Sequence, residues 1–210
     1  MSTPFPPLKR GLVAILRGVR PQEAQRVAEA VFEAGIEAIE VPLNSPEPFK
    51  SIEGIVAALP ASALLGAGTV LTPQQVDDLD AAGGRLLVSP NIDAAVMGRA
   101  AELGMVTMPG VFTPTEAFLA LKLGASALKF FPASALGPQG IAAIRAVLPA
   151  DTIVGAVGGV SENDFEAFGR ISVRTFGLGS SLYKPGMDAA DVGNRARAAV
   201  AVWDRVFGGE

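Results

Sequence analysis

The chain of 210 residues is predicted to fold as a closed barrel of eight parallel β-strands, each followed by an α-helix, the (β/α)8 or TIM-barrel class. Three observations predict this fold. Short apolar runs recur eight times along the chain, at intervals of roughly 20 to 27 residues. Within each run the apolar residues are consecutive, so both faces of the strand are apolar, as in a parallel sheet covered by helices. The segments between the runs have helical periodicity.

The predicted strands consist mainly of branched apolar residues, which suit buried strands of about 5 to 7 residues. They span residues 12–16, 36–41, 63–69, 86–90, 105–109, 127–131, 153–158 and 173–179.

The predicted helices fill the intervals, and most begin with a proline or a capping residue. The opening pairs are Arg20-Pro21, Ser45-Pro46, Thr72-Pro73, Thr113-Pro114, Gly137-Pro138 and Ser161-Glu162. Several helices are followed by a glycine, as expected of a left-handed residue just beyond a helix end. These glycines are Gly35, Gly83, Gly104 and Gly124.

Eight such units favour a closed barrel over the alternative, an open doubly wound sheet. No linker, low-complexity tract or shift in composition divides the chain, so we expect a single domain over residues 1–210.

The composition excludes several classes of function. Half of the residues are hydrophobic, which excludes a disordered chain, and a net charge of −4 offers no surface for nucleic acid or an anionic membrane. Histidine and cysteine are both absent, so zinc sites, thiolate nucleophiles and serine triads with a histidine base are not expected. No apolar run is long enough to span a membrane or to serve as a signal core, which predicts a cytoplasmic protein.

Lys129 lies inside the apolar run 127–131, where side chains alternate between the two faces of the strand. Leu128 and Phe130 share one face, so Lys129 points into the barrel, where desolvation lowers the pKa of its amine. A neutral amine can form a Schiff base with a carbonyl substrate. The alternative is a lysine that extends to solvent or pairs with a carboxylate. The other lysines lie in polar segments and are expected at the surface: Lys9, Lys50, Lys122 and Lys184.

Glu40 has the same position on the second strand, opposite in direction to Ile39 and Val41, and is expected to share the interior with Lys129. A carboxylate there could serve as general acid and base. An ion pair with Lys129 or Arg17 is an equally good interpretation.

The carboxyl ends of the strands, where active sites of such barrels lie, hold further candidates. Arg17 could bind a substrate carboxylate, with Thr69 as a second donor. Gly159, Gly179 and Ser180 follow the last two strands, where backbone N–H groups commonly bind phosphate. Surface positions and tight turns could also explain these residues. Other residues that could line the site are Asn44, Pro90, Phe131, Val157 and Gly158.

The chain resembles the 2-keto-3-deoxy-6-phosphogluconate and 2-keto-3-deoxy-6-phosphogalactonate aldolases, class I enzymes of sugar-acid catabolism. The resemblance rests on motifs whose order runs through nearly the whole sequence. They are AILRG (14–18), GIEAIEVPLNSP (35–46), GAGTVLTPQQV (66–76), VSPN (88–91), PGVFTPTEA (109–117), LKFFPAS (128–134), VGGV (157–160) and GLGSSL (177–182).

The resemblance implies a Schiff-base lysine at Lys129, proton transfer by Glu40, and contacts of the substrate carboxylate with Arg17 and Thr69. It places the phosphate at Gly159, Gly179 and Ser180. It also implies a metal-free enzyme without a cofactor and a homotrimer.

Two segments favour the galactonate-type enzymes, namely PLNSP with Asn44 and AVGGV with Val157. The gluconate-type enzymes often have TLRT and a threonine at these places. Two other functions remain open at this point: a phosphosugar isomerase or epimerase on the same barrel, and a non-catalytic protein that binds a phosphorylated ligand.

Overall fold

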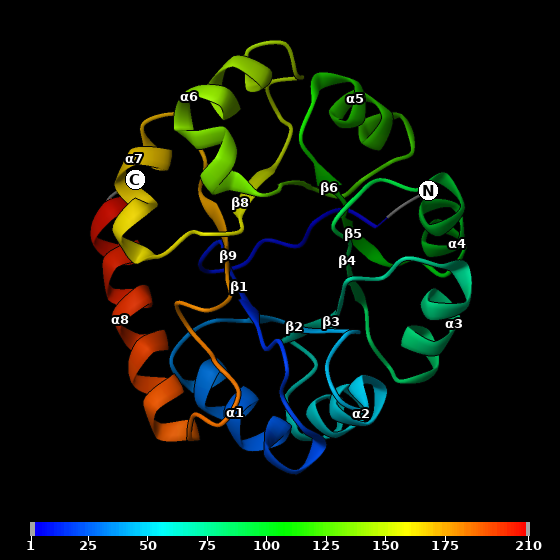
Figure 1. Ribbon diagram of the computed structural model, residues 1–210, viewed down its shortest axis with the longest axis vertical. Helices are drawn as coiled ribbons and strands as arrows, with labels where there is room; N and C mark the ends of the chain where they lie inside the picture. The colour runs from blue at the N-terminus through cyan, green and yellow to red at the C-terminus, as the bar shows by residue number, and fades with distance from the viewer. Residues whose placement is uncertain (1–2, 209–210) are drawn as a thin grey trace.

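The computed structural model describes residues 3–208, so residues 1–2 and 209–210 of the predicted domain lie outside the described part. The chain forms a ring of parallel strands surrounded by helices (Figure 1). Its strands are β1 (Leu12–Ile15), β2 (Ala38–Pro42), β3 (Leu64–Gly68), β4 (Leu86–Val88), β5 (Val106–Met108), β6 (Gly110–Val111), β7 (Leu128–Phe130), β8 (Val154–Val157) and β9 (Thr175–Leu178). Its helices are α1 (Pro21–Glu33), α2 (Pro48–Ala58), α3 (Pro73–Ala81), α4 (Ala94–Glu102), α5 (Pro114–Lys122), α6 (Ala133–Arg145), α7 (Phe165–Gly169) and α8 (Ala189–Phe207).

The strand order confirms the predicted barrel. Neighbouring strands are β5-β4-β3-β2-β1-β9-β8-β7-β6, and every pairing is parallel. Pro109 divides the fifth barrel strand into β5 and β6, and its carbonyl accepts a hydrogen bond of 3.0 Å from the Lys129 backbone N–H. The ring therefore closes through this strand, and the open doubly wound sheet is excluded.

Side chains of each strand alternate between two apolar clusters, as the period of two requires. Leu128, Phe130, Ile39 and Val41 pack in the cluster between the sheet and the helices. The barrel interior holds a smaller cluster. It contains Val13, Ile15, Ala38, Leu64, Leu86, Val88, Val106, Met108, Ala127 and Val157.

Most predicted helix ends are confirmed. Thr72 and Thr113 cap α3 and α5 by accepting hydrogen bonds from backbone N–H groups three residues later. Gly35, Gly83, Gly104 and Gly124 all have positive φ, as expected at left-handed positions beyond helix ends.

One predicted helix start is wrong, and another is found within α6. Helix α2 begins at Pro48 rather than after Ser45, because the Ser45 hydroxyl accepts a hydrogen bond of 2.9 Å from Gly18 N–H instead of capping the helix. Helix α6 begins at Ala133, but Gly137, with a φ of 63° and a ψ of 170°, is not helical and divides it into two helical parts. The second part begins at Pro138, as the pair Gly137-Pro138 predicts.

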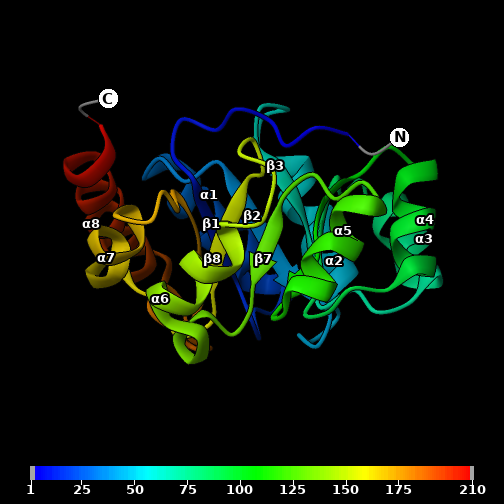
Figure 2. The ribbon, with the colours of Figure 1, turned by 90° about the horizontal axis from the view of Figure 1, so that it is seen from above.

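The amino-terminal segment covers the end of the barrel where the strands begin. Phe5 and Leu8 pack against the interior cluster, and the Thr3 carbonyl accepts a hydrogen bond from the Ser126 hydroxyl just before β7. Figure 2 shows this segment, in dark blue, running along one edge of the molecule. The amino-terminal segment does not cover the opposite end of the barrel, where the strands end and the cavity described below lies.

Candidate active site

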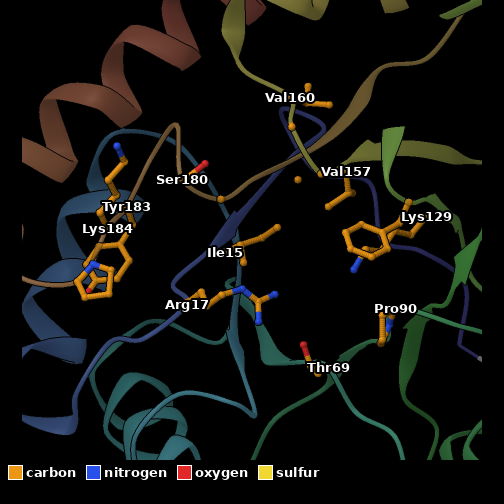
Figure 3. Close-up of a pocket in the computed structure, with 16 residues that line it drawn as sticks. Ile15, Arg17, Thr69, Pro90, Lys129, Val157, Val160, Ser180, Tyr183 and Lys184 are labelled. Carbon is orange, nitrogen blue, oxygen red and sulfur yellow. The ribbon is translucent and has the colours of Figure 1, made fainter. Parts of the chain in front are cut away.

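A cavity of about 570 Å³ lies at the carboxyl ends of the strands. Figure 3 shows the Arg17, Thr69 and Lys129 side chains turned toward this shared space. Ten of the predicted site residues line the cavity: Arg17, Thr69, Pro90, Lys129, Phe131, Val157, Gly158, Gly159, Gly179 and Ser180. Glu40 and Asn44 do not line it. The structure therefore brings most of the predicted residues together in one place.

Lys129 points into the barrel, as the alternation predicts. Lys129 is 5% exposed, and its two register partners are Gly110 on β6 and Gly155 on β8. Burial lowers the pKa of the amine; Glu40 acts in the opposite direction, and Arg17 adds a smaller lowering effect. The amine lies 4.6 Å from the centre of the Phe131 ring. This environment favours a neutral amine, the form that attacks a carbonyl carbon.

Glu40 is only 2% exposed, and the charges of Lys129 and Arg17 act on its carboxyl group. Its Oε2 atom is buried without a hydrogen-bond partner. Burial raises the pKa of Glu40 to about 7, against the opposing effects of the Lys129 and Arg17 charges. Within the described residues, neither Glu40 nor Lys129 takes part in an ion pair, so the interpretation of Glu40 as an ion-pair partner does not match the structure. A carboxyl that titrates near neutral pH can both accept and return a proton.

Arg17 follows β1 at the rim of the cavity, and its Nη1 donates a hydrogen bond to Oδ1 of Asn44 after β2. Asn44 therefore orients Arg17 rather than lining the cavity itself. Thr69, at the end of β3, has a φ of 59°, a left-handed conformation that β-branched residues rarely adopt. Such strain concentrates at functional sites, because the surrounding structure must impose it.

The glycines after β8 and β9 differ in their surroundings. Gly159 has a φ of 72°, and a Cβ atom there would lie 2.6 Å from the Ser134 hydroxyl in the first turn of α6. A Cβ atom at Gly179 would meet nothing within 4 Å. Gly159 is therefore required by the turn and by the approach of α6, whereas Gly179 borders open space in the cavity.

Several lining residues were not among those expected from the sequence, and of these Tyr183 and Lys184 are polar. Lys184 is exposed, as expected of a surface lysine, and it also lies at the rim of the cavity near Ser180. Tyr183 is buried and donates a hydrogen bond of 2.9 Å to Glu23 of α1. Their proximity to Ser180 in the sequence is the signal that could have indicated them.

Residues 3–208 contain no group of three or more histidine, cysteine, aspartate or glutamate side chains placed to hold a metal ion. None of the helices in this part of the chain is long and apolar enough to cross a membrane.

Comparison with known proteins gives close matches along almost the whole chain. A relative from Rhizobium meliloti (strain 1021), described as a probable 2-dehydro-3-deoxy-6-phosphogalactonate aldolase, is 61% identical over 99% of this chain and 98% of its own length. The 2-dehydro-3-deoxy-6-phosphogalactonate aldolase of Escherichia coli (strain K12) is 48% identical over 93% of this chain and 95% of its own.

A solved structure described as native KDPGal has a TM-score of 0.94 at 46% identity and covers 96% of this chain and 98% of its own. The family model for KDPG and KHG aldolases matches residues 8–200, which include every predicted site residue. The chain therefore belongs to the KDPG and KHG aldolase family.

Proposed function

We propose that the chain is a class I aldolase that cleaves 2-dehydro-3-deoxy-6-phosphogalactonate to pyruvate and D-glyceraldehyde 3-phosphate. The two relatives described above carry this activity in their names. The observation that carries the mechanism is Lys129, an amine that is 5% exposed, lacks an ion pair within residues 3–208 and lies at a cavity of substrate size.

In the first half of the proposed reaction, the neutral amine of Lys129 attacks the C2 keto carbon of the substrate. The resulting carbinolamine loses water and becomes an iminium. The Glu40 carboxylate then removes the proton from the C4 hydroxyl, directly or through a water molecule. The C3–C4 bond breaks, its electron pair moves toward the iminium to form an enamine, and C4 leaves as the aldehyde carbon.

In the second half, Glu40 returns the proton to C3 of the enamine, which gives the iminium of pyruvate. Water hydrolyses this iminium and frees pyruvate and the Lys129 amine. The pKa of about 7 of the Glu40 carboxyl suits both directions of transfer at neutral pH.

The charged ends of the substrate match the two sides of the cavity. Arg17, held by Asn44, would bind the carboxylate together with Thr69. The phosphate would lie against Gly159, Gly179 and Ser180, all of which line the cavity. Lys184 on the adjoining rim adds a cation that a phosphate would attract.

We infer a preference for the galactonate substrate over its gluconate epimer at C4. Val157 lines the cavity with an apolar side chain at the place where gluconate-type enzymes often have threonine. It cannot donate a hydrogen bond to the C4 hydroxyl. Because one such bond is worth about 0.5–1.5 kcal/mol, we expect the gluconate epimer to be cleaved more slowly but still to be a substrate. Comparing kcat/KM for the two epimers tests this preference.

We also propose that the active form is a homotrimer, as the resemblance implies. Large apolar side chains are exposed on the β6–α5 region: Phe112, Phe118 and Leu119. Burying such a surface between copies would stabilise an oligomer. Sedimentation equilibrium should give three times the chain mass, and a monomer would contradict the proposal.

Borohydride reduction in the presence of pyruvate tests the chemistry directly. Reduction of an iminium leaves a stable adduct, which mass spectrometry of peptides should place on Lys129. Lys129→Ala should give no adduct and no cleavage, whereas the matched control Lys184→Ala should still be labelled. An unlabelled wild-type enzyme would favour an isomerase, an epimerase or a non-catalytic binding protein on this barrel.

A further inference from the structure

We propose that Gly68 is a positioning residue for Glu40: by lacking a side chain, it leaves the space in which the Glu40 carboxylate lies. The inference rests on the proposed function only for the role of that carboxylate in proton transfer. Gly68 is the last residue of β3, and β3 pairs with β2, which carries Glu40.

The atoms nearest to a side chain at position 68 belong to Glu40. A Cβ atom built at this position would lie 1.9 Å from Oε2 of Glu40 and 2.4 Å from both Oε1 and Cδ, and these are the three nearest atoms. Contacts below about 3 Å do not occur between such atoms, so the carboxylate and a side chain at position 68 cannot both occupy this place.

The backbone of Gly68 gives no other reason for glycine. Its φ is not among the positive values of the chain, so any residue could adopt its conformation. Gly66, on the same strand, is different: a Cβ atom there would lie 1.8 Å from the backbone carbonyl oxygen of Leu86. Glycine at position 66 is required by the sheet, and glycine at position 68 is required by Glu40.

The Glu40 carboxylate is buried but is not anchored at Oε2. It is 2% exposed, and Oε2 makes no hydrogen bond that would hold it in place. Its register neighbours are Ile15 on β1 and Gly66 on β3. A methyl group at position 68 would therefore push the carboxylate out of its present place by more than an ångström.

Displacement of this size has consequences for catalysis. A misplacement of about 1 Å in a reacting group can cost on the order of 100-fold in rate. A carboxylate that moves toward water also loses part of the desolvation that raises its pKa. Gly68→Ala should thus affect the rate and the pH dependence together.

The kinetic test compares Gly68→Ala with Gly98→Ala, whose Cβ atom meets nothing within 4 Å on α4. We expect kcat of Gly68→Ala to fall on the order of 100-fold and the acidic limb of its pH profile to move to lower pH. Reductive trapping of pyruvate on Lys129 should persist, and Gly98→Ala should behave as wild type. An unchanged kcat and pH profile in Gly68→Ala would overturn the proposal.

A second measurement does not depend on activity. Thermal unfolding is compared for Gly68→Ala in the wild-type and in the Glu40→Ala background. We expect the substitution to lower Tm only while Glu40 is present, and a Gly68→Ala chain that folds only with Glu40→Ala would give the same support. Equal losses in both backgrounds, as expected for Gly66→Ala, would overturn it. If the wild-type enzyme forms no pyruvate adduct, the proposed function is wrong. The comparison of Tm values in the two backgrounds would still test whether a side chain at position 68 conflicts with Glu40.

Discussion

At the amino end of the barrel the interior is apolar and covered, whereas at the carboxyl end the same strands present charged groups to an open cavity. Val13, Leu64 and Val106 fill the first end, and the amino-terminal segment with Phe5 closes it. The second end holds Arg17, Lys129 and the buried Glu40. Residues that stabilise the barrel and residues that carry the proposed chemistry are therefore separated along the strands, so mutations at the two ends should have opposite effects on activity and stability.

After the loss of cleavage in Lys129→Ala, the largest effect is expected at the carboxyl end from Glu40→Gln. General acid and base catalysis contributes about 10² to 10⁴ in rate, so kcat should fall by that order while the borohydride-trapped adduct remains. Exchange of the methyl protons of pyruvate with deuterated water should slow as well, because it uses the same proton transfer. Near wild-type rates of both cleavage and exchange would assign Glu40 a structural role.

Glu40 should also make the stability of the protein depend on pH. In the folded state the pKa of the Glu40 carboxyl is about 7, compared with an ordinary value of 4.5 for an exposed glutamate in the unfolded chain. Between these two values the folded state binds more protons than the unfolded state, so the free energy of unfolding falls as the pH rises. The difference amounts to at most about 3 kcal/mol. Glu40→Gln should therefore gain stability relative to wild type between pH 4.5 and 7.5 in urea unfolding. A constant difference across this range would contradict the assigned burial.

A smaller effect is expected where the phosphate would bind. The backbone at Gly179 has no positive φ and its Cβ position is open, so Gly179→Leu should fold while its side chain occupies the cavity. Loss of a hydrogen bond to a charged group costs about 1.5–3 kcal/mol, which should raise KM for the phosphorylated substrate about 10- to 100-fold. The rate of pyruvate proton exchange serves as the internal control. Equal changes in KM for the phosphorylated substrate and in the rate of pyruvate exchange would show that the phosphate does not bind at Gly179.

The smallest effect is expected at the amino end, from Phe5→Ala. Phe5 is partly buried against the interior cluster, so its loss should lower the free energy of unfolding by about 1–2 kcal/mol. The cavity lies at the other end, so kcat and KM should stay close to wild type. A change in KM comparable to that of Gly179→Leu would show that the two ends are coupled.

The barrel and its two central residues could be predicted because strands impose a period of two on the sequence. Once Leu128 and Phe130 are assigned to the helix side, Lys129 must point inward, and the same holds for Glu40. Loops have no such period. The contact of Asn44 with Arg17 and the place of Lys184 depend on how the loops fold over the barrel, which no local pattern in the sequence specifies.

The start of α2 shows a further limit of local patterns. The sequence offers two prolines, Pro46 and Pro48, and either could occupy the first turn of a helix. The choice follows from Ser45, whose hydroxyl binds the backbone of Gly18 in the loop after β1. A long-range hydrogen bond thus decides a boundary that propensity leaves open.

Closure of the ring bears on how the protein can form during synthesis. Strand β1 pairs with β2 on one side and with β9 on the other, and the hydrogen bond from Tyr183 to Glu23 joins residues 160 positions apart. Until β9 has left the ribosome, one edge of β1 has no partner, and unpaired apolar edges promote aggregation. Nascent chains that end before β9 should therefore depend on chaperones, and the complete cavity can exist only after the last strand has been made.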